Sequence, residues 1–163
     1  MITMSGVAIE NLLANSLIGR LGLADVDGQP YCLPFPFCWH QGAIYLRLAM
    51  TGRKGDILKK NNRVCFEVDW CAEQMADYAS IIIEGRLMPV TDLSEKKAVQ
   101  AANEAKYRRL RPNHRPGHGR NTALEELAMH KITVSVLSGR CMEPRTTGQQ
   151  EMDTQRWLAA APL

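Results

Sequence analysis

The residue types best suited to chemistry gather in one short stretch of this chain, residues 45–55. There an apolar run leads into a hydroxyl at Thr51 and the cations Arg53 and Lys54, with glycines between and after them. If Thr51 caps a helix, the free N–H groups of the first turn and the positive end of the helix dipole favour an anion. Arg53 adds a bidentate fork and Lys54 a point charge, which together suit a phosphate group. The alternative is a solvated helix start that binds nothing, and the spacing of a Walker phosphate loop is absent.

No second group of residues has a spacing that points to catalysis or to metal binding. The histidines and cysteines lack the short paired spacing of zinc sites, so we expect no metal. No nucleophile stands in a recognisable arrangement with a base, so acyl transfer has no support and the catalytic residues stay unassigned. Five cysteines, an odd number, together with no N-terminal signal segment predict reduced thiols and a cytoplasmic protein.

The elements that must position this stretch are mostly strands. Alternation of Val64, Phe66 and Val68 is typical of a half-buried strand, and Asp92 with Glu95 three residues later is typical of a capping box. Strands are predicted over residues 18–24, 31–39, 43–49, 63–69, 78–90 and 131–137. Helices are predicted over 8–15, from 51 to about 61, and from 92 to about 109. Six or so strands at hairpin spacing with few helices indicate a mainly β protein, a small antiparallel barrel.

Two prolines interrupt the second predicted strand. Pro34 and Pro36 each remove a donor from the hydrogen-bond ladder. Proline in a strand belongs at an edge, at a bulge, or where something other than a strand approaches. We therefore expect part of this strand to lack a neighbouring strand.

Length and composition fit one soluble domain. The chain has 163 residues, 45% of them hydrophobic and 23% charged, which suits a globular protein without a membrane span. We predict a single domain over residues 1–143 and a C-terminal tail over 144–163, in which Trp157 is a packing residue. The net charge of +3 conceals one basic segment, residues 106–120, with six cations and no acid. Proline and glycine in this segment predict a loop after the long helix.

Several of these segments together resemble one known family. The strand and turn motifs between Leu21 and Trp70, with a further strand beyond them, are similar to the pyridoxamine 5'-phosphate oxidase-like, FMN-binding split-barrel proteins. The segments that carry the resemblance are Asp27 to Tyr31, Gly42 to Tyr45, Thr51 to Lys54, Asn62 to Phe66, and Tyr78 to Arg86. Together the matching region extends from Leu21 to Arg86. The subgroup that the chain most resembles is the nitroimidazole-resistance type of flavin-binding protein.

The resemblance implies a split β-barrel that forms a homodimer with two FMN sites at the subunit interface. It implies a small flavin oxidoreductase in which a nicotinamide nucleotide, or another donor, reduces FMN. The FMN then reduces a small organic acceptor, which in this subgroup is nitroaromatic. A non-catalytic carrier of FMN or haem is the alternative from another class. Oxidation of pyridoxamine phosphate is disfavoured, because the chain has no histidine after Met142 to match that branch's C-terminal Arg–His motif.

The resemblance also implies which residues contact the cofactor. Arg53 and Lys54 would hold the phosphate with help from Thr51, and Ser80 on a later strand would also reach the cofactor. The remaining expected contacts lie along the flavin on two strands: Cys32, Leu33, Pro34, Arg47, Leu48, Ala49 and Met50. Arg47 departs from the family pattern, since many relatives carry histidine there. An arginine at this position could add a cation to the phosphate region or point outward.

The basic segment is the second candidate for function. It could guard the flavin, attract an anionic electron donor such as NADPH, or contact nucleic acid. Nucleic acid is disfavoured because Tyr107 is the one aromatic residue in the run and no recognition element accompanies it. The alternative is a solvated loop without a binding role.

Overall fold

Alternating apolar residues turn most of this chain into antiparallel strands. In a computed structural model, which describes residues 1–72, 77–113 and 122–142, Val64, Phe66 and Val68 are buried while the residues between them are not. Residues 114–120 of the predicted basic loop and the predicted tail with Trp157 lie outside the described residues. The elements are β1 (Ile2–Thr3), α1 (Gly6–Asn15), β2 (Ile18–Ala24), β3 (Pro30–His40), β4 (Ala43–Arg47), α2 (Gly52–Lys60), β5 (Arg63–Cys71), β6 (Tyr78–Pro89), α3 (Leu93–Leu110) and β7 (Met129–Cys141).

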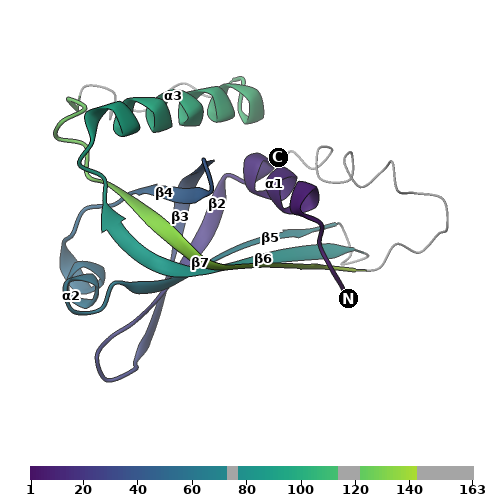
Figure 1. The fold of residues 1–163 in the computed structure, drawn as a ribbon, viewed down its shortest axis with the longest axis horizontal. Coiled ribbons are helices and arrows are strands. Elements are labelled where there is room, and N and C mark those ends of the chain that lie inside the picture. The colour runs from purple at the N-terminus through teal and green to yellow at the C-terminus, as the bar shows by residue number, and fades with distance from the viewer. Residues whose placement is uncertain (73–76, 114–121, 143–163) are drawn as a thin grey trace.

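The described strands form one sheet that closes on itself. Its order is β1-β7-β4-β3-β2-β5-β6, and β6 also pairs with β7. This pairing closes a six-stranded antiparallel barrel, with β1 as an extra strand on β7 (Figure 1). The mainly β, split-barrel type of fold expected from the sequence is confirmed. The interior is filled by apolar side chains with no exposed surface, among them Leu21, Phe66, Ile81 and Ile132.

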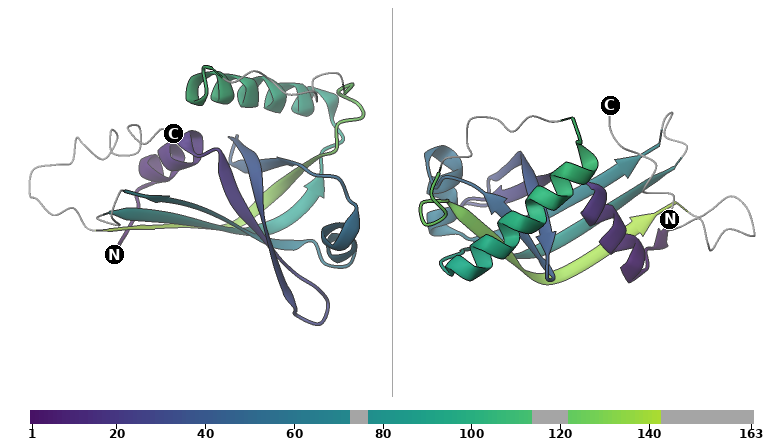
Figure 2. Two further views of the ribbon diagram at one scale, coloured as in Figure 1. Left: turned by 180° about the vertical axis from the view of Figure 1, so that it is seen from behind. Right: turned by 90° about the horizontal axis from the view of Figure 1, so that it is seen from above.

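Two short helices lie at opposite ends of the barrel, as the views in Figure 2 show. α1 buries Leu12 and Leu13 in the barrel core, and α2 buries Ile57 and Leu58 there. None of the helices in the described ranges is long and apolar enough to cross a membrane. α2 is the helix that the sequence predicts to start after Thr51, and its position at one end of the barrel fixes where that stretch lies.

The longest helix, α3, is held to the outside of the barrel by its first turn. Asp92 accepts a hydrogen bond from the Glu95 N–H at 2.7 Å, which confirms half of the predicted capping box. The other half is wrong, because the Glu95 carboxylate does not return to the cap. It accepts hydrogen bonds from the Tyr45 hydroxyl at 2.7 Å and the Lys131 ammonium at 2.8 Å. Tyr45 on β4 and Lys131 on β7 are directly opposite in register, so one carboxylate joins α3 to two strands.

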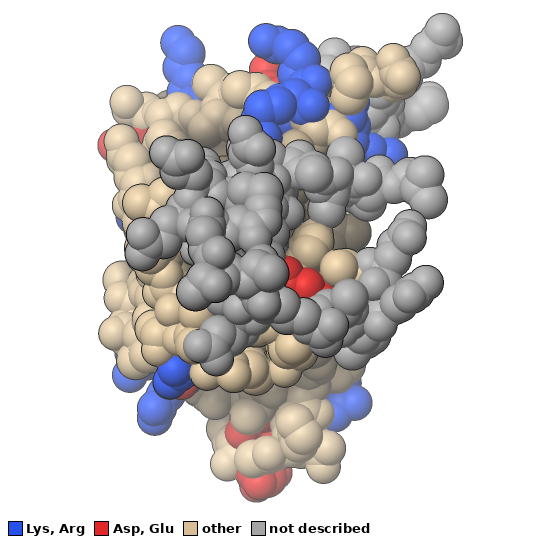
Figure 3. Space-filling view, turned by 90° about the vertical axis from the view of Figure 1, so that its right-hand side faces the viewer, with Lys and Arg blue, Asp and Glu red and all other residues tan. Residues whose placement is uncertain are grey.

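The last turns of α3 dock on the end of α1. The Lys106 amino group is buried and donates to the Leu13 carbonyl at 3.3 Å and the Phe37 carbonyl at 3.2 Å. Arg109 donates to the Ala14 carbonyl at 2.9 Å. The prediction of a basic loop from residue 106 is therefore wrong at its start, because α3 continues to Leu110 and its cations satisfy carbonyls at the end of α1. Blue side chains gather at the top of the face in Figure 3, where this end of α3 lies.

Candidate functional site

The barrel is split where β3 and β4 stop pairing. β4 pairs with β3 only between Phe37 and His40, whereas the first part of β3, from Pro30 to Pro36, pairs with β2 alone. Past β4 the Leu48 N–H bonds the Ala128 carbonyl at 3.0 Å, so the chain turns toward β7 and away from β3. Within the described residues this first part of β3 therefore has no strand on one side. The expectation that the prolines mark such an edge is confirmed.

Main-chain groups at this open edge can be assigned from the direction of one hydrogen bond. The Phe37 N–H donates to the Leu17 carbonyl at 3.4 Å, on the side of β2. Because neighbouring residues of a strand alternate in direction, even-numbered residues of β3 direct their main-chain groups to the open edge. Three of these are prolines, so Cys32 supplies the N–H donor at the centre of the edge. The edge offers one donor between carbonyl acceptors, beside which a flat, polar-edged ring can lie.

The chain between β4 and α2 adopts an open turn. Thr51 occupies the N-cap position with extended backbone (φ −125°, ψ 157°), yet its side chain makes no capping hydrogen bond. The expected cap position is therefore confirmed and the expected cap bond is not formed. Gly52 has φ +64°, with nothing within 4 Å of where a Cβ would stand, and a Cβ on Gly55 would lie 2.5 Å from the Met50 carbonyl carbon. The main chain at Met50 thus packs closely against Gly55 in the first turn of α2. The N–H groups of that turn and the Thr51 hydroxyl remain available to bind a ligand.

The two cations of this turn behave differently. The Arg53 guanidinium lies over the Tyr31 ring at 4.6 Å from its centroid, which joins the start of α2 to the open edge of β3. Within residues 1–72, 77–113 and 122–142, Arg53 has no ion pair or hydrogen bond from its side chain. Lys54 donates to the Thr51 carbonyl at 3.2 Å and so helps to close the turn. Sequence reasoning missed Tyr31 as a partner of Arg53, since the two residues belong to different elements and no local spacing relates them.

The stretch from Arg47 to Met50 contributes less side-chain surface than expected. Leu48 is buried in the barrel core and Met50 packs against that core, so each can offer a ligand mainly its main chain. Ala49 and Arg47 are exposed. Arg47 extends from the end of β4 opposite Met129, on the face of the sheet that carries Tyr45.

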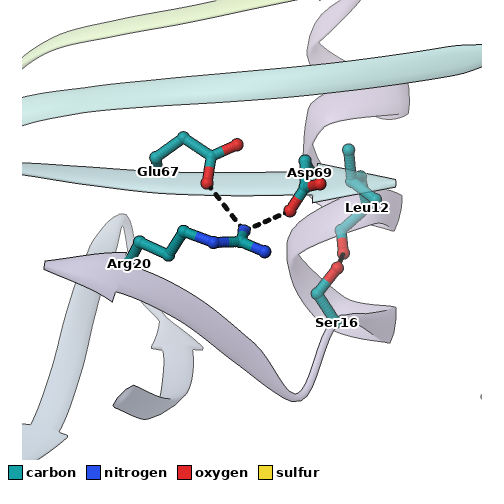
Figure 4. A network of polar contacts seen from close by, with 5 residues as sticks. All are labelled: Leu12, Ser16, Arg20, Glu67 and Asp69. Carbon is teal, nitrogen blue, oxygen red and sulfur yellow. Dashed lines mark hydrogen bonds and ion pairs between the residues drawn. The ribbon is translucent and has the colours of Figure 1, made fainter. Parts of the chain in front are cut away.

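Another arginine near the open edge is fully engaged. Arg20 on β2 is opposite Pro34 in register and binds the carboxylates of Glu67, at 2.9 Å, and Asp69 on β5 (Figure 4). The hydrogen bonds that Arg20 donates to Asp69 and Glu67 raise the pKa of the guanidinium, while burial raises the pKa of Glu67. Glu67 and Asp69 thus both pair with the same cation. Arg20 has no charge left to offer an anion, whereas Arg53 does.

Ser80 lies far from Arg47, another predicted cofactor contact, in the same chain. It is opposite Arg140 on β7, whereas Arg47 is opposite Met129 at the other end of that strand. The intervening length of strand is about 35 Å at 3.3 Å per residue. The structure thus brings the β3 edge, the end of β4 and the start of α2 together and leaves Ser80 at the opposite end of the barrel.

The described residues hold no group of three histidine, cysteine or acidic side chains that could bind a metal ion. His130 points into the barrel with Leu46, its register partner, and burial lowers the pKa of its imidazole. Cys32, Cys38, Cys65 and Cys71 are free thiols, and the cytoplasmic location that the sequence predicts stays a prediction.

A split antiparallel barrel with a helix start at its open edge defines the class of FMN-binding split-barrel folds. Consistent with this class, the family model of pyridoxamine 5'-phosphate oxidase matches residues 7–141. The chain belongs to this family, whose members and structural relatives include flavin-binding split barrels. No curated protein matches the chain.

Solved structures share the fold at low sequence identity. A protein of Bacteroides thetaiotaomicron described as a 5-nitroimidazole antibiotic resistance protein is 21% identical, with a TM-score of 0.66 and 86% of each chain covered. A FAD-binding protein of Mesorhizobium loti is 25% identical, with a TM-score of 0.63, covering 87% of this chain and 98% of that one. A FAD-binding protein of Mycobacterium smegmatis is 19% identical, with a TM-score of 0.64, covering 86% and 98% respectively.

Proposed function

We propose that this protein binds FMN at the split between β3 and the start of α2 and is a flavin-dependent oxidoreductase for a small organic acceptor. The observation that carries the proposal is Arg53, a cation without an anionic partner among the described residues, at a helix start whose Thr51 hydroxyl is also uncommitted. A phosphate monoester needs cationic and N–H partners of this kind. FMN supplies the electron transfer when bound, and the protein binds and orients it.

The open edge of β3 fits the flavin ring. A flavin ring is flat and carries acceptors and one donor along its polar edge, which match the Cys32 N–H and the proline carbonyls beside it. Cys32 and Pro34 are exposed on this segment, and Leu33 is half-buried. With the phosphate at Arg53 and the ring along β3, the ribityl chain would pass the main chain of residues 48–51. This arrangement uses the predicted contacts, with Leu48 contributing through its backbone.

Ser80 and the family pattern favour a homodimer. One chain cannot bring Ser80 to Arg53, because the two residues lie at opposite ends of the barrel. A second copy related by a suitably placed two-fold axis could bring Ser80 of one subunit near Arg53 of the other. We therefore propose two FMN sites, each built from both subunits.

We favour FMN over FAD, since Arg53 and the turn offer one compact anion site. The name of the Bacteroides relative favours a nitroaromatic acceptor, and a nicotinamide nucleotide is the proposed donor. Treating the flavin-loaded protein with NADPH or NADH and then with a nitroimidazole tests these assignments. Bleaching of the flavin band by the donor, and its return on adding the acceptor, would support the enzyme. A bound flavin that neither donor reduces would favour a carrier, and a Soret band would favour haem.

The binding step is tested by purifying the protein and two variants. The wild-type protein should carry a yellow chromophore that chromatography identifies as FMN. The variant that combines Arg53→Ala with Lys54→Ala should lose FMN. Its melting temperature should stay within a few degrees of the wild-type value, because Arg53 is exposed and Lys54 is only half-buried. Arg20→Ala is the matched control, since Arg20 is already paired with carboxylates. A colourless wild-type protein that also fails to take up added FMN would defeat the proposal.

A further inference from the structure

We infer that Tyr31 is a positioning residue that holds Arg53 toward the phosphate and so makes the site selective for flavins that carry one. This inference rests on the proposed function, because it concerns the same site. Tyr31 does not need to touch the flavin to have this effect. It acts through the orientation of the arginine.

The contact suits this role because it fixes the guanidinium without consuming its donors. Arg53 stacks on the Tyr31 ring with 4.6 Å between the guanidinium carbon and the ring centroid. A guanidinium held over a ring by its face keeps its edge N–H groups for hydrogen bonds, whereas one held by a carboxylate does not. Arg20, bound to Glu67 and Asp69, is the contrasting case on the same sheet.

The ring itself is fixed by the barrel. Tyr31 is half-buried, packs against the main core cluster and stands opposite Leu23, which is 5% exposed. Arg53, by comparison, is an exposed side chain at the surface end of α2 with several rotatable bonds. A rigid platform under a flexible cation removes conformational freedom that phosphate binding would otherwise have to remove.

No other cation of the turn has such a platform in the described residues. Lys54 donates to the Thr51 carbonyl at 3.2 Å, which holds it close to the main chain. Arg47 has no ring beneath it, and it precedes the turn. The effect of Tyr31 should therefore reach the ligand through Arg53 alone, and it should be confined to the phosphate.

The test compares FMN with riboflavin, which has the same ring and ribityl chain but no phosphate. Dissociation constants for both are measured by fluorescence titration of the flavin-free full chain, for the wild type and for Tyr31→Phe, Tyr31→Leu, Arg53→Ala and the Leu/Ala double variant. Tyr31→Phe keeps the ring and should keep the preference for FMN. Tyr31→Leu should weaken FMN binding about two- to fivefold, the size of one exposed cation–π contact, and leave riboflavin binding unchanged.

The double variant separates positioning from a general structural role. If Tyr31 acts through Arg53, Tyr31→Leu should have no further effect on the FMN-to-riboflavin ratio once Arg53 is alanine. Equal ratios for Tyr31→Leu and Tyr31→Phe, or equal loss of both flavins, would overturn the inference while leaving the proposed function intact. A wild-type protein that binds neither flavin would overturn both, so the two failures are distinguishable.

Discussion

Lys106 is the most deeply buried cation near the end of α3 and stands in an apolar setting. Its ammonium lies 3.9 Å from the Phe37 ring centroid and donates to two carbonyls, with no carboxylate bonded to it. Burial lowers the pKa of this amine from 10.5 to about 8, with the nearby Arg109 charge acting in the same direction. The contact that docks α3 on α1 therefore includes a buried ammonium group, and keeping this group charged lowers the stability of the folded state.

The lowered pKa of Lys106 predicts that the free energy of unfolding increases at alkaline pH. Below pH 8 Lys106 is charged in both states. Between pH 8 and 10.5 the unfolded chain keeps the proton and the folded chain has lost it, so the free energy of unfolding rises with pH. The Lys106 contribution should grow by about 3 kcal/mol over this window. Urea unfolding of the wild type and Lys106→Met at pH 7 and pH 10 measures it as the change in their difference.

Lys106→Arg is the matched control, because arginine keeps its proton throughout this range. Its free energy of unfolding should lack the rise that the wild type shows relative to Lys106→Met. The free energies of unfolding of the wild type and Lys106→Met could instead differ by the same amount at both pH values. The Lys106 amine would then not be buried as a charged group at neutral pH, and α3 would not dock on α1 through it.

An interaction between two residues can be predicted from the sequence when the residues are close together along the chain. Asp92 as a helix cap follows from residues three positions apart, and the structure confirms it. The contacts of Glu95 with Tyr45 and of Arg53 with Tyr31 join elements that are distant in the sequence. Their partners are set by strand register, which residue spacing along the chain does not encode.

Among the elements, α3 depends on one carboxylate to fix its start on the barrel. Glu95 receives hydrogen bonds from Lys131 and from Tyr45, and these hold the pKa of its carboxyl below its usual value. A lowered carboxyl pKa stabilises the fold above the unfolded value, near 4.5, and this contribution is lost as the pH falls below it. The anchor should therefore weaken in acid.

Glu95→Gln tests this anchor at neutral pH. The side chains of Glu95 and Lys131 are partly exposed, at 28% and 34%, so the loss should be modest, about 1 kcal/mol. Thermal unfolding of Glu95→Gln, Lys131→Met and the double variant measures it. The effects of the two single changes should not add, because they break the same ion pair. Full additivity would show that the pair does not form in solution.

The elements themselves could largely be predicted. Period-two alternation predicts β5 because the one buried face of this strand imposes that pattern. The turn between β2 and β3 is equally local, since the Asp25 carboxylate accepts hydrogen bonds from the Asp27 and Gln29 N–H groups and Gly28 has a positive φ. The end of α3 agrees with the predicted end near residue 109, but the sequence does not predict that the last cations of this helix are engaged. A run of cations suggests a solvated loop, yet Lys106 is buried because the end of α1 presents carbonyls to it.

Taken as a whole, the barrel separates its proposed cofactor contacts between two ends. Arg53 and the open edge of β3 lie by α2, whereas Ser80 lies about 35 Å along β7 from the end of β4. A monomer could use only one of these ends for a given FMN. In the two-fold dimer that we propose, opposite ends of two barrels would come together, so that each site would take Arg53 from one subunit and Ser80 from the other.

Mixing two defective variants tests this arrangement. Arg53→Ala and Ser80→Tyr should each fail to hold FMN as homodimers, the first by losing the phosphate contact and the second by filling the ring site from the partner's side. After unfolding and refolding together in equal amounts, half of the dimers should be mixed. Each mixed dimer should contain one intact site and one doubly defective site, so about a quarter of all sites should bind FMN. Flavin absorbance of the dimer fraction measures this recovery. If Ser80 and Arg53 served the same chain's site, mixing would recover none; a monomer in light scattering would exclude the shared site altogether.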